Sequence, residues 1–224
     1  MQPIQAILFE PVGCLAEFAP EEFDAIAARF FGRPSPSGRS GSEAYWNVLN
    51  LIAAGSQELT AREWAIVADH EITAVDRVHA YEDVAPALLA LQDLGITSIL
   101  ASSLSAAAVA RFLKKFSLAD LFADVWSRDT AGGMRDAPLV QAVRHRSLKP
   151  DRVMFLTDTA EGLQTAKHVG VNAILMMNEP DEAMKLTAHE PAGGIVSLHE
   201  LPDFVRFLSA ENARVGAVST RRRI

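Results

Sequence analysis

The 224-residue chain contains a single cysteine, Cys14, and this scarcity excludes several kinds of structure. One thiol allows neither an internal disulfide nor a metal site built from a cluster of cysteines. Met1–Gln5 is not a basic region followed by a long apolar stretch, so we expect no signal peptide. No run approaches the roughly 18 apolar residues that span a membrane. Together these absences predict a soluble, cytoplasmic protein without a membrane partner.

Positive charge is also scarce, which argues against a nucleic-acid partner. The chain has 21 Lys and Arg against 28 Asp and Glu, a net charge of −7. The exception is the C-terminal end, where Arg221, Arg222 and Arg223 follow one another. We interpret residues 211–224 as a solvated basic tail, with a contact to nucleic acid or to an acidic partner as the alternative. Apolar residues make up 49% of the chain, which is enough for a sizeable core.

The first part of the chain predicts one strand and then a helical module. Ile4–Phe9 is a short apolar run that ends at the turn Glu10–Gly13, as in a buried strand. Amphipathic patterns then predict helices over Glu21–Phe31, Glu43–Ala53 and Ala61 to about Asp76. The capping box Thr60-x-x-Glu63 opens the third of these helices. We predict no strand between Glu17 and Glu82.

From Val84 onward, predicted helices and strands alternate. The strands are expected at Ile96–Ala101, Asp124–Trp126, Val153–Leu156, Ala173–Met176 and Ile195–Val196. The helices are expected at Val84–Leu94, Ala106–Phe116, Ala137–Arg146 and Glu161–Val169, with a last one from the capping box Ser197-x-x-Glu200. This alternation predicts an α/β fold with a parallel, Rossmann-like sheet. Such sheets place their functional residues at the carboxyl ends of the strands.

Four segments at these strand ends resemble, in order, the motifs of the haloacid dehalogenase-like hydrolases. Ile7–Leu15 resembles the motif hhhDxDGTL, and Gly95–Ser103 resembles the strand that ends in Ser or Thr. Arg135–Pro138 resembles the Lys-Pro-x-Pro segment, and Phe155–Gly170 resembles GDSxxDxxAAxxAG. The resemblance implies a core domain of residues 1–16 and 83–210. It also implies a small helical cap, residues 17–82, that covers the sheet edge as a lid.

The family's catalytic carboxylates are largely replaced in this chain. In the family's phosphatases the first Asp attacks phosphorus and the Asp two residues later transfers the proton; here these positions are Glu10 and Val12. Misplacing an attacking oxygen by about an ångström can cost on the order of a hundredfold, and loss of acid–base help about 10²–10⁴-fold. The family's Lys falls on Arg135, and its last acid falls on Gly162.

The resemblance implies Glu10, Ser102, Arg135 and Asp158 as catalytic candidates, which we expect around one cleft below the helical module. Ser103 and Arg39 are candidate substrate-binding residues. Ser102, Arg135 and helix N-termini could form an anion pocket for a small phosphorylated molecule. Glu10, the Val12 carbonyl and Asp158 could bind Mg²⁺ weakly.

Three hypotheses stay open at this point. The chain could be a weak or inactive phosphohydrolase that binds a phosphate ligand or a protein partner. It could instead be an active magnesium-dependent phosphatase with Glu10 as its nucleophile. The third hypothesis is a dehalogenase. The family's dehalogenases also lack the second Asp, which agrees with Val12, but they keep the first Asp, where this chain has Glu10. Structural roles compete at three places: Cys14 could be a core residue, Ser102 and Ser103 could cap one helix, and Thr157–Thr159 could cap another.

Overall fold

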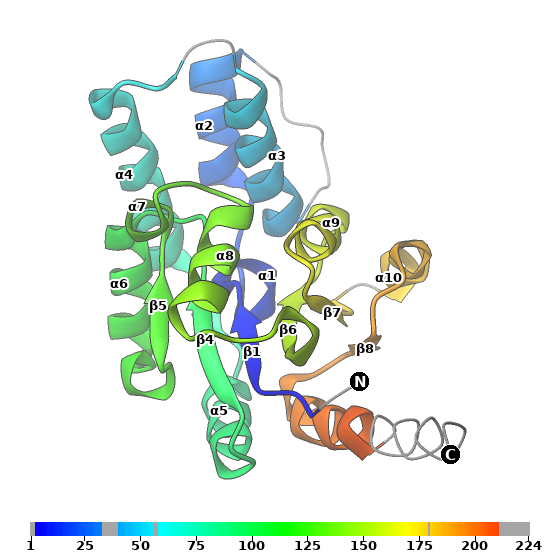
Figure 1. Cartoon of the computed structure of the whole chain (residues 1–224). Coiled ribbons are helices and arrows are strands. Elements are labelled where there is room, and N and C mark those ends of the chain that lie inside the picture. Colours follow the sequence, from blue (N-terminus) through cyan, green and yellow to red (C-terminus); the bar gives the residue numbers. More distant parts are fainter. Residues whose placement is uncertain (1–2, 33–39, 56–57, 179, 211–224) are drawn as a thin grey trace.

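The computed structural model describes residues 3–32, 40–55, 58–178 and 180–210, so the candidate Arg39 and the tail 211–224 lie outside it. Its core is a six-stranded, all-parallel sheet with the order β5-β4-β1-β6-β7-β8 (Figure 1). The strands are β1 (Ala6–Phe9), β4 (Thr97–Ala101), β5 (Asp124–Trp126), β6 (Val153–Thr157), β7 (Asn172–Met176) and β8 (Gly193–Ile195). The predicted Rossmann-like α/β fold is therefore confirmed, and each strand begins and ends within two residues of its expected range.

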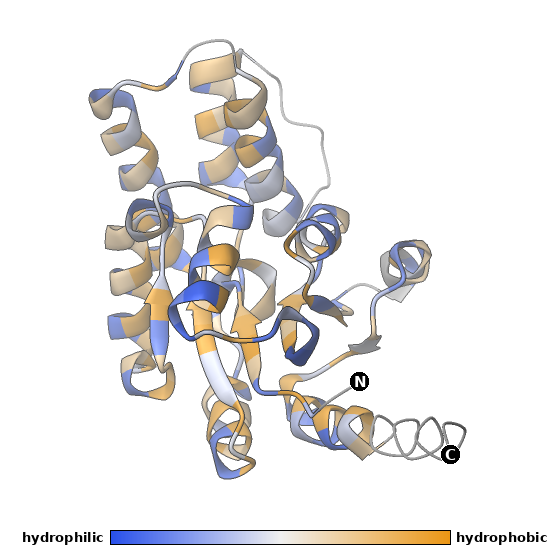
Figure 2. Ribbon diagram, viewed as in Figure 1, coloured by the Kyte–Doolittle hydropathy of each residue, from blue (hydrophilic) through white to orange (hydrophobic). Residues whose placement is uncertain are grey.

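Both faces of the sheet are covered, which explains why its strands are apolar along their whole length. In β1, Ile7 and Phe9 join the larger core cluster, whereas Ala6 and Leu8 join the second one. The larger cluster includes α5 (Val84–Asp93) and α6 (Ala106–Phe116); the second includes α8 (Asp136–His145) and α9 (Ala160–Val169). Figure 2 shows the strands as a mostly hydrophobic layer between helices with mixed faces.

A helical module follows the first strand and lies beyond the carboxyl edge of the sheet (Figure 1). It consists of α2 (Glu21–Phe31), α3 (Gly41–Ala54) and α4 (Ala61–Arg77). The predicted capping box of Thr60 and Glu63 is present at the start of α4. The expectation of no strand between Glu17 and Glu82 was wrong, because β2 (Ala16–Glu17) pairs antiparallel with β3 (His79–Ala80). Two-residue strands are too short to leave an alternating pattern.

Buried charge joins the module to the core. Arg128 and Glu71 are 6% and 3% exposed, and Arg128 Nη1 donates to Glu71 Oε1. The same nitrogen donates to the Ser103 carbonyl oxygen at 3.2 Å, and the backbone N–H of Ser105 donates to Glu71 Oε2 at 2.9 Å. The guanidinium lies 4.6 Å from the centre of the Trp64 ring on α4. Every charged group in this contact therefore has a partner, which buried charges require.

The remaining elements connect these layers. They are the short helices α1 (Pro11–Cys14), α7 (Arg128–Ala131) and α10 (Pro180–Leu186), a helix over the described residues 201–210, and the 3₁₀ turns Ala119–Leu121, Pro150–Arg152, Thr187–His189 and Leu198–Glu200. The predicted capping box at Ser197 was wrong, because Glu200 accepts from Val196 N–H and the 3₁₀ turn precedes the helix. Among the described residues, we find no helix with the length and apolarity needed to cross a membrane.

Candidate active site

Glu10 lies directly after β1, where the sequence predicted it, but its carboxyl group is enclosed. The residue is 4% exposed. The hydroxyl of Ser102, at the end of β4, donates to Glu10 Oε1 at 2.5 Å. The hydroxyl of Tyr45 donates to Oε2 at 3.1 Å, and the backbone N–H of Ser103 donates to the same oxygen at 3.4 Å. Both carboxyl oxygens are thus occupied by protein donors.

This enclosure changes the charge of the group. Burial raises the pKa of Glu10 from 4.5 to about 8, although the hydrogen bonds from Ser102, Tyr45 and the amides of Ser103 and Val12 lower it. Desolvation disfavours the ionised form more than these donors favour it. At pH 7 only about a tenth of Glu10 is then a carboxylate. A neutral carboxylic acid is a poor nucleophile, because attack requires the ionised oxygen.

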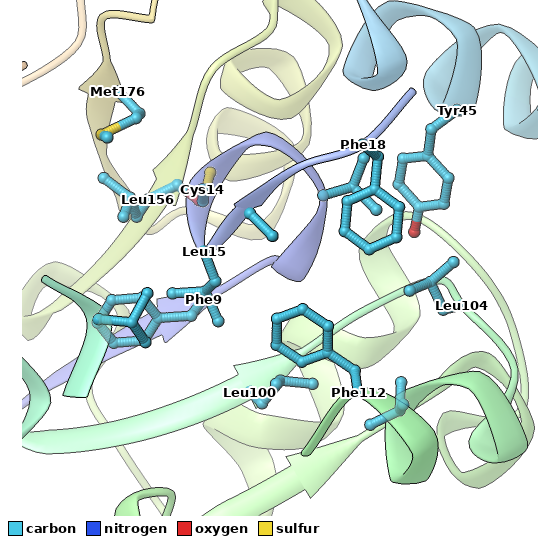
Figure 3. Close-up of a cluster of buried hydrophobic side chains, with 14 of the residues drawn as sticks. Phe9, Cys14, Leu15, Phe18, Tyr45, Leu100, Leu104, Phe112, Leu156 and Met176 are labelled. Carbon is cyan, nitrogen blue, oxygen red and sulfur yellow. The ribbon is translucent and has the colours of Figure 1, made fainter. Parts of the chain in front are cut away.

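Tyr45 comes from the helical module, and nothing in its local sequence indicated this contact. It lies on α3, is 1% exposed, and its ring stacks obliquely on Phe23 at a centroid distance of 5.4 Å. Figure 3 shows Tyr45 reaching from α3 with its hydroxyl directed toward the segment that carries Leu104. Burial also raises the pKa of the Tyr45 phenol, so that it stays a hydrogen-bond donor. The module therefore closes the end of β1 with an aromatic ring.

The protein itself uses the hydroxyls of Ser102, expected in an anion pocket, and of Ser103, a candidate substrate-binding residue. Ser102 and Ser103 are 0% and 2% exposed. Besides donating to Glu10, Ser102 Oγ accepts from Leu104 N–H at 3.1 Å, while Ser103 Oγ accepts from Arg135 N–H at 2.6 Å. Arg135 holds a positive φ of 58°, which is uncommon outside glycine. The structure does not form an anion pocket from these hydroxyls. The N-cap of α6 is Ser105, not Ser102 or Ser103.

Asp158, directly after β6, lies against the turn that follows β1. Gly13 has φ +79°, and a Cβ there would be 2.1 Å from both Asp158 Oδ2 and Ser42 Oγ. Asn178 Nδ2 donates to the Gly13 carbonyl at 2.8 Å and to Asp158 Oδ2 at 3.2 Å. Asn178 follows β7, so the strand-end rule that found Asp158 could have found it too.

Asp158 faces a cleft of about 800 Å³ that Glu10, Ser102 and Arg135 do not line. This cleft, called here the β6–β7 cleft, is bordered by the turn after β1, the start of α3, the start of α9 and the residues after β7. The expectation that all four catalytic candidates surround one cleft was therefore wrong. Glu10 and Ser102 meet in a closed pocket because Tyr45 fills the space above them, and Asp158 opens onto a different space.

The position of the last acid in the family motif has no side chain here and no space for one. Gly162 stands at that position, and a Cβ there would lie 1.8 Å from Thr157 Oγ1. Thr157 itself stands where the motif GDSxxD has glycine. The threonine side chain thus occupies the space that an acid at position 162 would need. Thr159 caps α9 by accepting from Gly162 N–H at 3.2 Å, as one of the cap hypotheses expected.

The residues expected to bind Mg²⁺ do not fit that ion as they are arranged. Mg²⁺ is usually held by one or two carboxylates together with several waters in a near-ideal octahedron. Glu10 is enclosed and mainly neutral, Val12 is 1% exposed, and Gly162 provides no carboxylate. Within residues 3–32, 40–55, 58–178 and 180–210, no three His, Cys, Asp or Glu side chains are grouped to hold a metal ion. Cys14 is a core residue whose thiol donates to the Leu156 carbonyl oxygen at 3.4 Å.

The sequence pattern described as haloacid dehalogenase-like hydrolase matches residues 49–176, more than half of the chain. The chain belongs to this family.

Solved structures with the same fold include L-2-haloacid dehalogenase from Xanthobacter autotrophicus with covalently bound chloropropionic acid (TM-score 0.64, 16% identity, covering 91% of this chain and 98% of that one). A family hydrolase from Deinococcus radiodurans with bound phosphate and sodium has TM-score 0.61 and 19% identity, covering 90% and 94%. A predicted phosphoglycolate phosphatase from Haemophilus somnus has TM-score 0.62 and 15% identity, covering 90% and 97%. No curated protein matches the sequence. At these identities the likeness of this haloacid dehalogenase-like chain to the solved structures concerns the fold.

Proposed function

We propose that this haloacid dehalogenase-like chain functions by binding a ligand and does not turn over phosphate esters by the family's carboxylate chemistry. The observation that carries the proposal is the pocket around Glu10. Ser102 and Tyr45 occupy both oxygens of its carboxyl group, and burial raises its pKa to about 8. A phosphate ester could reach this group only if the Tyr45 ring moved away.

The absence of a second reacting group supports the same conclusion. Val12 cannot donate a proton to a leaving group or activate water, and general acid–base catalysis typically contributes about 10²–10⁴-fold. Val12 is also 1% exposed, so a water molecule cannot simply take its place beside Glu10. Thr157 occupies the room for an acid at position 162. Turnover would therefore have to proceed without the carboxylates that the family has at positions 12 and 162, with Asp158 as the one supporting acid that is kept.

The other two hypotheses meet the same obstacle. A magnesium-dependent phosphatase and a dehalogenase would both use Glu10 as a nucleophile, and both need its ionised oxygen exposed to substrate. A small phosphorylated ligand gains no support either, because the described residues around the β6–β7 cleft include no Lys, Arg or His. A protein partner stays a prediction.

A substrate screen tests the proposal directly. Wild type and Glu10→Ala are incubated with Mg²⁺ and a broad panel of phosphate esters, and separately with 2-haloacids, and released phosphate or halide is measured. We expect the two proteins to release equal, background amounts. Turnover in the wild type that Glu10→Ala abolishes would overturn the proposal. Thermal melting of both proteins checks that the variant is folded.

A further inference from the structure

The β6–β7 cleft is large enough for a small organic molecule. Its volume of about 800 Å³ lies within the roughly 300–1,000 Å³ usual for ligand pockets. It lies at the carboxyl ends of parallel strands, the usual place for ligands in α/β proteins. Its walls come from both the core and the helical module, so a ligand there would contact segments far apart in the sequence.

The described residues that line the cleft carry a net negative charge. Five acidic residues line it, and none of its described lining residues is Lys, Arg or His. The acids are Glu17, Glu43, Asp83, Asp158 and Glu161. Two of them already accept hydrogen bonds from the protein: Glu43 Oε2 accepts from Ser40 N–H at 2.9 Å, and Asp83 Oδ2 accepts from the Ser197 hydroxyl at 2.7 Å. In contrast, the carboxylates of Glu17 and Glu161 have no hydrogen-bond or ion-pair partner within the described part of the chain.

A hydroxyl group of a largely buried residue faces the same space. Ser42 lines the cleft, is 4% exposed and lies beside the turn at Gly13. Its Oγ makes no hydrogen bond with any residue in the described ranges. Because this oxygen opens onto the cleft and is not used by the described residues, a ligand group can hydrogen-bond to it. A hydroxyl oxygen accepts readily from an N–H donor.

The rest of the wall is apolar and aromatic. Tyr81, Met176 and Val196 also line the cleft, as does Phe18, whose ring lies against Phe23 and Phe112. Aromatic faces attract cations, and the methionine and valine suit an alkyl body. A bare metal ion would use neither feature, and no group of three potential metal ligands is present among the described residues. A phosphate would meet the carboxylates of Glu17 and Glu161, and none of the described lining residues is a cation that could bind it.

We infer that the β6–β7 cleft binds an organic ammonium compound, with its charged nitrogen near Glu17, Glu161 and Ser42 and its carbon body on the apolar wall. This inference rests on the proposed binding function and gives it a class of ligand. It differs from the expectation of an anionic, phosphorylated ligand that the family resemblance implied.

Isothermal titration of the full chain with spermidine, a flexible triammonium compound, tests the inference. We expect saturable binding with one site per chain. We expect affinity to fall about tenfold in Glu17→Gln/Glu161→Gln, because each ion pair of this exposure contributes up to about 1 kcal/mol. The matched control Glu58→Gln/Asp120→Asn removes the same net charge at exposed positions outside the cleft, and it should bind like the wild type.

Three results would overturn the inference: no spermidine binding at millimolar concentration, an equal loss of affinity in both double variants, or saturable binding of inorganic phosphate that Glu17→Gln/Glu161→Gln strengthens. Circular dichroism melts establish that the variants fold. Failure of the proposed function gives a different result: turnover that Glu10→Ala abolishes, whether or not spermidine binds. Ser42→Ala should weaken spermidine binding by about tenfold, the effect of losing one hydrogen bond to a charged group.

Discussion

Two neighbouring strand ends at the same edge of the sheet have opposite character in this protein. After β1, Glu10 is buried, hydrogen-bonded on both oxygens and mainly neutral. After β6, Asp158 faces an open, acidic cleft of about 800 Å³. Helix α3 lies above both, with Tyr45 over Glu10 and Ser42 beside the turn at Gly13.

The difference between the two places comes from side-chain size on one helix. Ser42 and Tyr45 are three residues apart on α3, so they lie on neighbouring parts of the same face. The tyrosine ring fills the space over the family's nucleophile position, while the small serine leaves room beside Asp158. The helical module thus decides which strand end a ligand can reach. This conclusion depends on the module being held tightly, and it can be tested at four places.

The largest effect is expected where the module is attached to the core. Arg128→Ala leaves the Glu71 carboxylate buried without a counter-charge, which typically destabilises by about 3–5 kcal/mol. The free energy of unfolding in urea measures this loss. The control is Arg111→Ala, whose ion pair with Asp76 is about half exposed and should contribute at most about 1 kcal/mol. Equal losses in the two variants would contradict a buried, essential attachment.

The next effect concerns the charge of Glu10 and depends on pH. Its pKa is about 8 in the folded protein and near 4.5 when exposed, so the folded state holds the proton longer. Stability from this group is therefore complete below pH 4.5 and is lost as pH rises toward 8. Glu10→Gln, which mimics the neutral acid, should unfold like wild type at pH 5 and be more stable at pH 8.5, by on the order of 3 kcal/mol. Urea unfolding at the two pH values decides this, and a wild type that equals or exceeds the variant at pH 8.5 would refute the neutral pocket.

A smaller effect is expected at Gly162 and Thr157, which stand where the family motif has an acid and a glycine. Gly162→Ala forces a methyl group onto Thr157 Oγ1 and should destabilise by about 1–3 kcal/mol, the usual range for overpacking. Adding Thr157→Gly removes the clash, so the double variant should lose less stability than the two single variants together. A double-mutant cycle from denaturant unfolding measures this coupling. Strictly additive stability losses would mean that the Thr157 side chain does not occupy the space that a side chain at position 162 would need.

The smallest effect is expected from the hydroxyl that closes the Glu10 pocket. Tyr45→Phe keeps the ring and removes one hydrogen bond to Glu10 Oε2, which should cost about 1 kcal/mol at neutral pH. Because that bond lowers the pKa of Glu10, its loss should raise the pKa further, so the fall in stability that begins near pH 4.5 should continue to a higher pH. Unfolding free energies between pH 5 and pH 9 follow the shift. A shift to lower pH would contradict the contact.

The order and kind of the elements followed from the sequence alone. Periodic apolar patterns and capping residues are local signals, so α2 and α6 were predicted to the residue and the Thr60–Glu63 capping box was correct. Strand ends could also be read, and they correctly marked Glu10, Ser102 and Asp158 as residues at one edge of the sheet. One further signal was overlooked: Glu71 interrupts the apolar stripe from Val67 to Val78, a position that implies a buried partner.

What the tertiary structure decided is the state of those strand-end residues. Tyr45 meets Glu10 across 35 residues of sequence, Arg128 meets Glu71 across 57, and Asn178 meets Gly13 across 165. Contacts between such distant segments leave no local pattern, and a carboxyl group's pKa depends on how completely those segments exclude water. For this reason the sequence determined which side chains stand at the edge of the sheet. Only the folded helical module decided that Glu10 is sealed and neutral while Asp158 borders an open cleft.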